Sequence, residues 1–243
     1  MKLIQKLLIV SLLSVIVFSS CDLFGEDVSE PSKVDTRPTF NSSYSVLWAL
    51  NTKTSVNTDG LGINIGDTQV DFGTAFAAFT DGGNYVSAGD VKVNDNLLKM
   101  ESNKIYLSNV SLTNLMGITF EGNAKWSVAG ANNIPAVNYT TNKSFPTASG
   151  FTCDATVDKT ASYTISLSSV SNADSIIFMV NDIVKTVRGN IKSVTFTSEQ
   201  LSSLKNGNSF VQVAPYNYEI KQFGSKNFVF GNQIVFSKLV TIK

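Results

Sequence analysis

From Phe40 to the carboxyl terminus, apolar and polar residues alternate in short runs separated by Asn, Asp and Gly. Residues 163–168 are an example, because Tyr163, Ile165 and Leu167 alternate there with Thr and Ser. A period of two in β-branched and aromatic residues is typical of strands with one buried face, not of helices. The pattern therefore predicts a body built almost entirely of β-strands.

The same pattern places strands along the whole body. We expect them within residues 44–49, 70–76, 91–93, 97–100, 105–107, 118–120, 126–128, 163–167, 175–180, 194–196, 210–218, 228–230 and 233–242. Asn94-Asp95-Asn96 and Gly231-Asn232 are turn signals that predict hairpins. One helical turn is expected at residues 198–204, with Ser198 as its cap.

Strands in succession, without intervening helices, favour antiparallel sandwiches over a parallel α/β sheet. A sandwich takes about 100 residues, so the length of the body predicts two in tandem. Residues 143–150 break the alternation, and we place the boundary there, with one β-sandwich domain in residues 40–145 and a second in 146–243. A single large barrel over residues 40–242 is the alternative, because all-β domains reach this size.

The second half of the body resembles the immunoglobulin-like or fibronectin-like modules of bacterial surface proteins. The resemblance lies in its length and in the short helical turn at residues 198–204 between two strands. The Cys-Trp-Cys set that marks true immunoglobulin domains does not occur in this half. The resemblance implies an Ig-like β-sandwich for residues 146–243.

The first 21 residues differ from the body. Lys2 and Lys6 come first, an apolar run follows over residues 7–18, and Ser19-Ser20-Cys21 ends the zone. The run is about 12 residues long, short of the ~20 that a membrane-spanning helix needs. It predicts a signal peptide over residues 1–20, with a retained helical anchor as the alternative.

Ser19, Ser20 and Cys21 resemble the lipobox of bacterial lipoproteins, in which small residues precede a cysteine that is acylated. Phe18 departs from the aliphatic residue that is usual three places before that cysteine. The resemblance covers about a tenth of the chain and implies lipidation of Cys21, with membrane contact through this anchor alone. Ordinary secretory cleavage, which would leave Cys21 as a free thiol, is the alternative.

Residues 21–39 contain the lipidated cysteine and an acidic, turn-forming segment without alternation or helical period. This composition predicts a flexible tether, which over residues 22–39 reaches at most about 60 Å. Its early acidic residues resemble the export segment of some Gram-negative lipoproteins, which implies the outer membrane. Its periplasmic and external faces are both compatible with the tether, and a merely solvated spacer is the alternative.

Charge and residue types exclude several functions. The chain has 19 Lys and Arg, 19 Asp and Glu, and no His, so it lacks the basic excess of a nucleic-acid-binding protein. Without His, no Ser-His or Cys-His nucleophile pair and no His-based metal site can form. Cys153 is expected to be a small buried hydrophobe. We therefore predict no catalytic residues, no metal and no cofactor.

Trp126, Tyr216 and Tyr218 are the candidate ligand-binding residues, because aromatic faces can stack on a sugar ring. In Tyr216-Asn217-Tyr218, both rings lie on one face of the expected strand, opposite Asn217. Sandwich cores also need aromatic residues. Trp48 is therefore assigned to the core, and a core position is the favoured interpretation for Trp126, with stacking as the alternative.

These observations predict a non-enzymatic, lipid-anchored cell-envelope protein that displays β-sandwich modules for binding or for a structural role. A glycan-binding accessory lipoprotein is a second hypothesis, and an adhesion or assembly protein is a third. The expected partners are the membrane, through the lipid anchor, and a glycan or another envelope protein; nucleic acid is not among them.

Overall fold

The computed structural model describes residues 40–56, 68–108 and 116–243. The predicted signal peptide, the predicted lipidation of Cys21 and the predicted tether lie outside these residues. The strands are β1 (Ser45–Val56), β2 (Thr68–Ala78), β3 (Thr80–Asp81), β4 (Asn84–Tyr85), β5 (Val91–Val93), β6 (Asn96–Met100), β7 (Tyr106–Ser108), β8 (Lys125–Val128), β9 (Val137–Thr140), β10 (Thr147–Ser149), β11 (Thr156–Val157), β12 (Tyr163–Ser166), β13 (Ser169–Ser171), β14 (Ser175–Val180), β15 (Ile183–Arg188), β16 (Ser193–Phe196), β17 (Gly207–Phe223) and β18 (Lys226–Ile242), and the helical turn is α2 (Ser198–Leu201).

Nearly all of this regular structure is strand, so the predicted all-β class is confirmed. The largest sheet has twelve strands, in the order β15-β14-β17-β18-β1-β2-β7-β6-β5-β8-β9, with β11 added to β18. Three pairs, β10-β13, β12-β16 and β3-β4, form small separate sheets.

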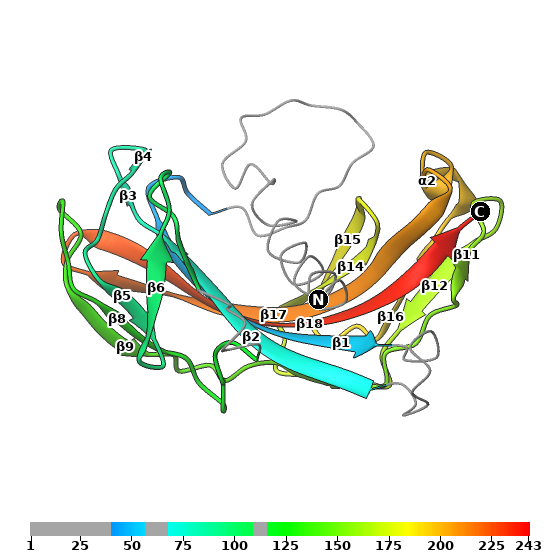
Figure 1. Ribbon diagram of the computed structural model, residues 1–243, viewed down its shortest axis with the longest axis horizontal. Coiled ribbons are helices and arrows are strands. Elements are labelled where there is room, and N and C mark those ends of the chain that lie inside the picture. Colours follow the sequence, from blue (N-terminus) through cyan, green and yellow to red (C-terminus); the bar gives the residue numbers. More distant parts are fainter. Residues whose placement is uncertain (1–39, 57–67, 109–115) are drawn as a thin grey trace, which may run out of the picture.

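The long hairpin β17-β18 is the spine of a curved sheet. Its strands pair from Gly207 opposite Ile242 to Phe223 opposite Lys226, and they run from one end of the crescent to the other (Figure 1). We call the inner side of the crescent the concave face and the outer side the convex face. The short strands β5, β8 and β9 lie under one end and β11, β12 and β16 under the other (Figure 1).

Two hydrophobic cores share the convex face of this hairpin. Phe228 and Phe230 of β18 are fully buried in the first core, which also contains Trp126. Phe236 and Val240, further along the same strand, lie in the second core. Residues beyond the predicted domain boundary at 145/146 thus supply side chains to the cores at both ends of the crescent.

The predicted hairpin at Gly231-Asn232 is wrong. β18 runs unbroken from Lys226 to Ile242, and the turn that joins it to β17 contains Gly224, which has a φ of +57°. Gly231 has a different role, because the Trp48 ring lies directly over it and a Cβ at this position would overlap the ring. A glycine inside a strand often marks such a close approach.

The hairpin predicted at Asn94-Asp95 is confirmed. Both residues have positive φ, 46° and 63°, as a two-residue hairpin turn with the right twist requires, and β5 pairs with β6 across it. The helical turn α2 is also present, but its N-cap is Thr197 rather than Ser198. The Thr197 hydroxyl accepts from the backbone of Gln200, whose side chain reaches back to the cap.

Two further predictions of strand arrangement are corrected. β1 pairs in parallel with β18 and antiparallel with β2, so the large sheet is mixed rather than purely antiparallel. No strand forms at residues 118–120; only Gly117 bridges there to Gly73. The two glycines approach so closely that a Cβ on either would overlap the backbone of the other segment, and this tertiary contact replaces a regular ladder.

Candidate functional site

The concave face carries a third hydrophobic cluster, which we call the concave cluster. On β1, Val46 and Trp48 point to this cluster, whereas Leu47 and Ala49 point to the first core. The same alternation on the other strands brings the remaining members together. Its buried residues are Val46, Trp48, Leu50, Ile177, Ala214, Tyr216, Val229 and Val235, and Phe40, Tyr44, Phe76, Val184 and Tyr218 pack against them.

This cluster is built differently from the two convex cores. Its members come from β1, β2, β14, β15, β17 and β18 of one sheet, apart from Phe40 and Tyr44, which precede β1. Within the part of the chain that the structure describes, no other hydrophobic side chain packs against it. The described residues therefore supply two convex cores with opposing strands, whereas the concave cluster is formed by one sheet with Phe40 and Tyr44, and its buried members retain at most 8% of their surface exposed.

Aromatic rings form the centre of the concave cluster. The ring centroids of Trp48 and Tyr216 are 5.8 Å apart with an interplanar angle of 50°. Phe40 lies 6.2 Å from Trp48 and meets the edge of Tyr218 at 5.2 Å. These separations are in the range in which aromatic pairs attract one another. The first described residue of the chain is thus held on the concave face.

A buried amide lies beneath the Trp48 ring. The Trp48 Nε1–H donates to Gln233 Oε1 at 2.8 Å, and Gln233 has no exposed surface. Its Nε2 group has no hydrogen-bond partner among the described residues, and neither has the Thr52 hydroxyl on the same face. A buried polar group without a partner costs about 1–3 kcal/mol. Gln233 Nε2 and the Thr52 hydroxyl are therefore two buried polar groups on the concave side without a partner among the described residues.

The two faces of the sheet differ sharply in charge. On the six strands that form the concave cluster, the strand register places only one Lys, Arg, Asp or Glu of the described residues on the concave side, Arg188 at the end of β15. The convex side of the same strands carries Lys53, Asp71, Lys185, Glu219, Lys221, Lys226 and Lys238. The concave face is consequently apolar with neutral Thr, Ser and Gln groups, and it suits an uncharged partner.

Tyr216 supplies a neutral hydroxyl on this face. Burial of the ring raises the pKa of the Tyr216 hydroxyl, and the nearby Ser175 hydroxyl and Arg188 charge oppose this only in part. The hydroxyl is therefore protonated at neutral pH.

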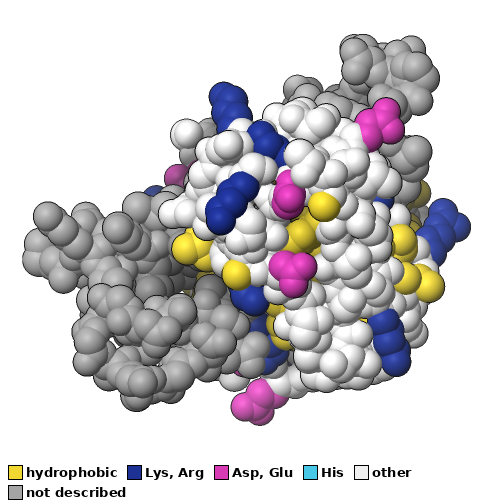
Figure 2. Space-filling view, turned by 90° about the vertical axis from the view of Figure 1, so that its right-hand side faces the viewer, with side chains coloured by type: hydrophobic (Ala, Val, Ile, Leu, Met, Phe, Trp, Pro, Cys, Tyr) yellow, Lys and Arg dark blue, Asp and Glu magenta, His cyan; other side chains and the backbone are white. Residues whose placement is uncertain are grey.

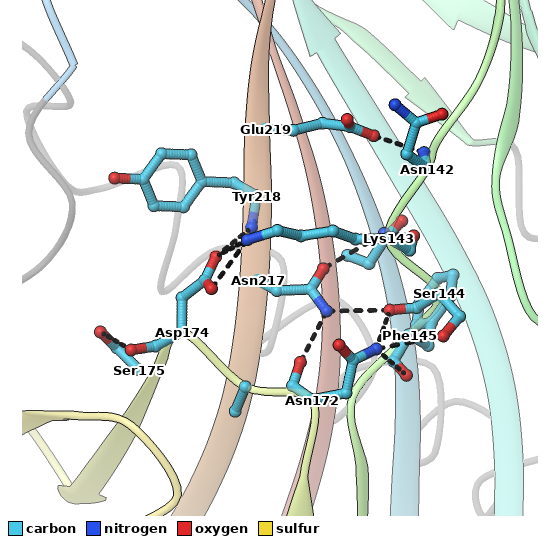
Figure 3. A network of polar contacts seen from close by, with 12 residues as sticks. Asn142, Lys143, Ser144, Phe145, Asn172, Asp174, Ser175, Asn217, Tyr218 and Glu219 are labelled. Atoms are coloured by element: carbon cyan, nitrogen blue, oxygen red, sulfur yellow. Dashed lines mark hydrogen bonds and ion pairs between the residues drawn. The ribbon is translucent and has the colours of Figure 1, made fainter.

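On the opposite side of the same strand, Asn217 belongs to a network that we call the polar seam (Figure 3). Asn217 is fully buried, and its Nδ2 donates to the carbonyl oxygens of Ser144 at 2.8 Å and Asn172 at 2.7 Å. Its neighbour Asn232 donates to the carbonyl of Lys143 at 2.8 Å. The seam ties the segments around residues 143 and 172 to the middle of the hairpin, between the two convex cores.

An ion pair joins the polar seam to Tyr218. Lys143 Nζ lies 2.7 Å from both carboxylate oxygens of Asp174, and the backbone N–H of Tyr218 donates to the same carboxylate at 3.0 Å. Figure 3 shows the Tyr218 ring pointing away from Asn217 and Ser144. The seam therefore fixes the backbone that presents the Tyr218 ring to the concave face.

The structure separates the three predicted ligand-binding residues. Trp126 has no exposed surface and packs in the first core, so its ring has no open face. Tyr216, 2% exposed, and the half-buried Tyr218 belong to the concave cluster. The prediction that both Tyr rings share one face, opposite Asn217, is confirmed.

Sequence reasoning missed two residues of the site. The sequence predicts Trp48 in a sandwich core and Gln233 at the start of a strand that follows a turn, so neither is predicted as a site residue. Reading residues 229–235 as one strand would have placed Val229, Gly231, Gln233 and Val235 on a single face.

The rest of the described surface has few side chains that could react or hold a metal ion. Figure 2 views the end of the molecule at the right of Figure 1, where the described surface is mostly neutral with separate charged side chains and small scattered apolar spots. Cys153 packs against the second core, and burial raises the pKa of its thiol. Among the described residues, no group of three or more His, Cys, Asp or Glu could hold a metal ion.

No helix in the described ranges is both long and apolar enough to cross a membrane. No family model matches the sequence, and no curated protein matches it either.

Proposed function

We propose that this protein is a non-enzymatic, lipid-anchored protein of the outer membrane that binds a partner on its concave face. The observation that carries this proposal is the concave cluster, an apolar sheet face to which the described residues add only Phe40 and Tyr44 from outside the sheet. The Ig-like character of residues 146–243 and the acylation of Cys21 are parts of the same proposal. They rest on the strand pattern and on the lipobox-like Ser19-Ser20-Cys21.

The position of Phe40 supports a link between the anchor and this face. Phe40, the first described residue, contacts Trp48 and Tyr218 on the concave side. Residues 22–39 span about 23 Å as a coil. A body tethered in this way keeps its concave face within reach of the membrane that holds the anchor.

Glycan binding is a second candidate, favoured by the half-buried Tyr218 ring and by the Asp174 carboxylate, which accepts a hydrogen bond from the Tyr218 backbone N–H. Sugar recognition combines a stacking ring with amide and carboxylate partners, and only Tyr218 among the three predicted aromatic residues retains substantial exposed surface. Trp126 takes no part in this version of the proposal.

Adjacent residues on one strand test the binding role. Ile220 points to the concave face and is 46% exposed, and Lys221 next to it points to the convex face. Cysteine is introduced at either position, and maleimide labelling is measured in isolated outer membranes and again after detergent extraction. We expect extraction to accelerate labelling at position 220 but not at 221. Equal labelling at position 220 before and after extraction would contradict a bound partner on this face.

The anchor has a separate test. Mass spectrometry of the mature amino-terminal peptide is expected to show an acylated Cys21. An unmodified Cys21, or a chain that still begins at Met1, would refute the lipid anchor while leaving the concave face as a binding surface.

A further inference from the structure

Near the hairpin turn, β17 has a neighbouring strand on only one side. β14 pairs with β17 as far as Tyr216, whereas β18 pairs with it as far as Phe223. Within the part of the chain that the structure describes, no strand takes the place of β14 beyond Tyr216. We call residues 219–222 the open edge. Ile220 is 46% exposed there and Gln222 is exposed as well, so a partner can reach this edge.

The open edge presents backbone hydrogen-bonding groups. In an antiparallel pair, every second residue bonds to the neighbouring strand and the residues between them point away from it. Tyr218 points away from β18, because its N–H donates to the Asp174 carboxylate, and Ile220 and Gln222 follow at intervals of two. Among the described residues, no group accepts a hydrogen bond from the N–H of Ile220 or Gln222. These two donors and the carbonyl groups beside them are available to a partner.

The side chains of the open edge do not block it. Natural proteins commonly protect a sheet edge with Pro, with a bulge or with a charged side chain, Lys above all. The open edge contains no Pro. Its one Lys, Lys221, has its Nζ 3.5 Å from the Glu219 carboxylate and 5.9 Å from the centre of the Tyr139 ring on the convex side. The edge is therefore accessible and has no net charge.

The Asp174 carboxylate marks one end of the open edge (Figure 3). β14 begins directly after Asp174, which therefore lies beside Asn217 and accepts from the Tyr218 N–H. An added strand can lie beside residues 219–222 and continue past the hairpin turn, but it cannot continue toward β14.

A second copy of the chain does not fit within this limit. Two open edges paired about Ile220 would place Phe223 of the second copy beside Asn217, where Asp174 already lies. Pairing about Lys221 avoids this overlap but sets two Lys side chains directly opposite each other, which is destabilising. A centre nearer the turn pairs mainly turn residues. The open edge therefore suits an extended segment that has no hairpin of its own.

We propose that the open edge binds an extended segment of another protein by β-strand addition, with backbone carbonyl oxygens of that segment accepting from the N–H groups of Ile220 and Gln222. The segment places an apolar side chain beside Ile220 and uncharged side chains on the convex side, where Glu219 and Lys221 already neutralise each other. This contact goes beyond the proposed function, because it uses the backbone of one strand rather than the side chains of the concave face.

Photo-crosslinking of the full chain in living cells tests the proposal. Benzoylphenylalanine is incorporated in place of Gln222 at the open edge and, as the control, in place of Asn208, which is exposed near the other end of β17. On illumination the ketone takes a hydrogen atom from a nearby C–H bond and the two carbon radicals join, so the adduct mass is the sum of both partners. Mass spectrometry of the peptide that contains the probe identifies what it has joined.

A substitution in the backbone of the open edge separates strand addition from mere proximity. Ile220→Pro removes the N–H that points away from β18 and leaves the bonds to β18 in place, whereas Ile220→Thr changes the side chain and keeps the N–H. We expect position 222 to crosslink to a peptide of another protein, and we expect this adduct to be lost in Ile220→Pro and retained in Ile220→Thr. Position 208 is expected to give no adduct with that protein.

Hydrogen exchange provides a second measurement that does not depend on the folding of the proline variant. The Gln222 amide is expected to exchange more slowly in isolated outer membranes than in the purified chain, and equal rates would overturn the proposal. An adduct of position 222 with this chain itself, with a second copy, with a lipid or with a sugar would also overturn it. The same holds for no adduct, or for a protein adduct that persists in Ile220→Pro.

Discussion

The two tryptophans show how differently the two faces of this sheet are used. Trp126 is enclosed between strands on the convex side, with Phe228, Phe230 and many aliphatic neighbours in the first core. Trp48 lies on the concave side over Gly231, with a hydrogen bond to a buried Gln233 and neighbours that belong almost entirely to its own sheet. A ring in the first environment packs between two layers, whereas a ring in the second packs mainly against its own sheet, on the face that we propose as the binding face.

The largest expected effect is the difference in stability lost when each of the two tryptophans is replaced by alanine. Trp126→Ala removes a fully buried ring from between two layers and is expected to lower the free energy of unfolding by about 3–5 kcal/mol. Trp48→Ala is expected to cost less, because the described residues place no opposing strand over this ring, whereas Trp126 lies between two layers. Urea unfolding of both variants measures the difference, and equal losses would mean that Trp48 is also a core residue.

The polar seam is expected to contribute the next largest effect. Asn217→Leu removes the side-chain donor to the carbonyl oxygen of Asn172 and one of the two side-chain donors to that of Ser144, which costs about 1–3 kcal/mol. Asn208→Leu, at an exposed position of the same strand, is the control. Urea unfolding of the two variants makes the comparison, and an equal effect at position 208 would show that strand propensity, not the seam, is responsible.

Gly231 tests the packing of Trp48 directly. Gly231→Ala places a methyl group in the volume of the Trp48 ring and is expected to destabilise the protein by about 1–3 kcal/mol through overpacking. In the double variant with Trp48→Ala the penalty should largely disappear, because the ring that it collides with is gone. A strictly additive double-mutant cycle in thermal unfolding would contradict this contact.

The smallest expected effect is the pH-dependent contribution of Asp81 to stability, at a position far from the concave face. Lys226 and Asn133 donate to the Asp81 carboxylate and lower its pKa from its usual value. A lowered pKa in the folded state means a stabilising contribution that is present above the unfolded-state pKa and is lost as the pH falls through the folded-state value. Because Asp81 is exposed to solvent, the contribution is small. NMR titration should show that its pKa rises toward the usual value in Lys226→Met; no change would exclude the pairing.

Local alternation predicted much of the fold, because the residue types along each strand indicate which of its sides is buried and which is exposed. Residues 175–180 are continuously apolar after the first and form β14, whose residues after Ser175 are all buried. The paired rings of Tyr216 and Tyr218 were likewise predictable from a period of two. These features depend only on neighbours in the sequence.

The features of the fold that the sequence does not predict depend on contacts between segments that are distant in the sequence. Gly231-Asn232 has the composition of a turn, and only the Trp48 ring, brought over it by the parallel pairing of β1 with β18, explains a glycine inside a strand. Asn232 is kept within the same strand by the polar seam. The concave cluster itself is recognisable only when six strands are set side by side, because each strand alone also satisfies the pattern of a sandwich core.

The accessibility of two neighbouring positions near the other end of the hairpin tests the difference between the two faces most directly. Leu239 points to the concave face and is 56% exposed, and Lys238 next to it points to the convex face. Cysteine is introduced at either position, and the rate of maleimide labelling is measured in isolated outer membranes and after detergent extraction. We expect extraction to accelerate labelling at position 239 and not at position 238. Equal labelling rates at position 239 before and after extraction would contradict a partner bound on the concave face.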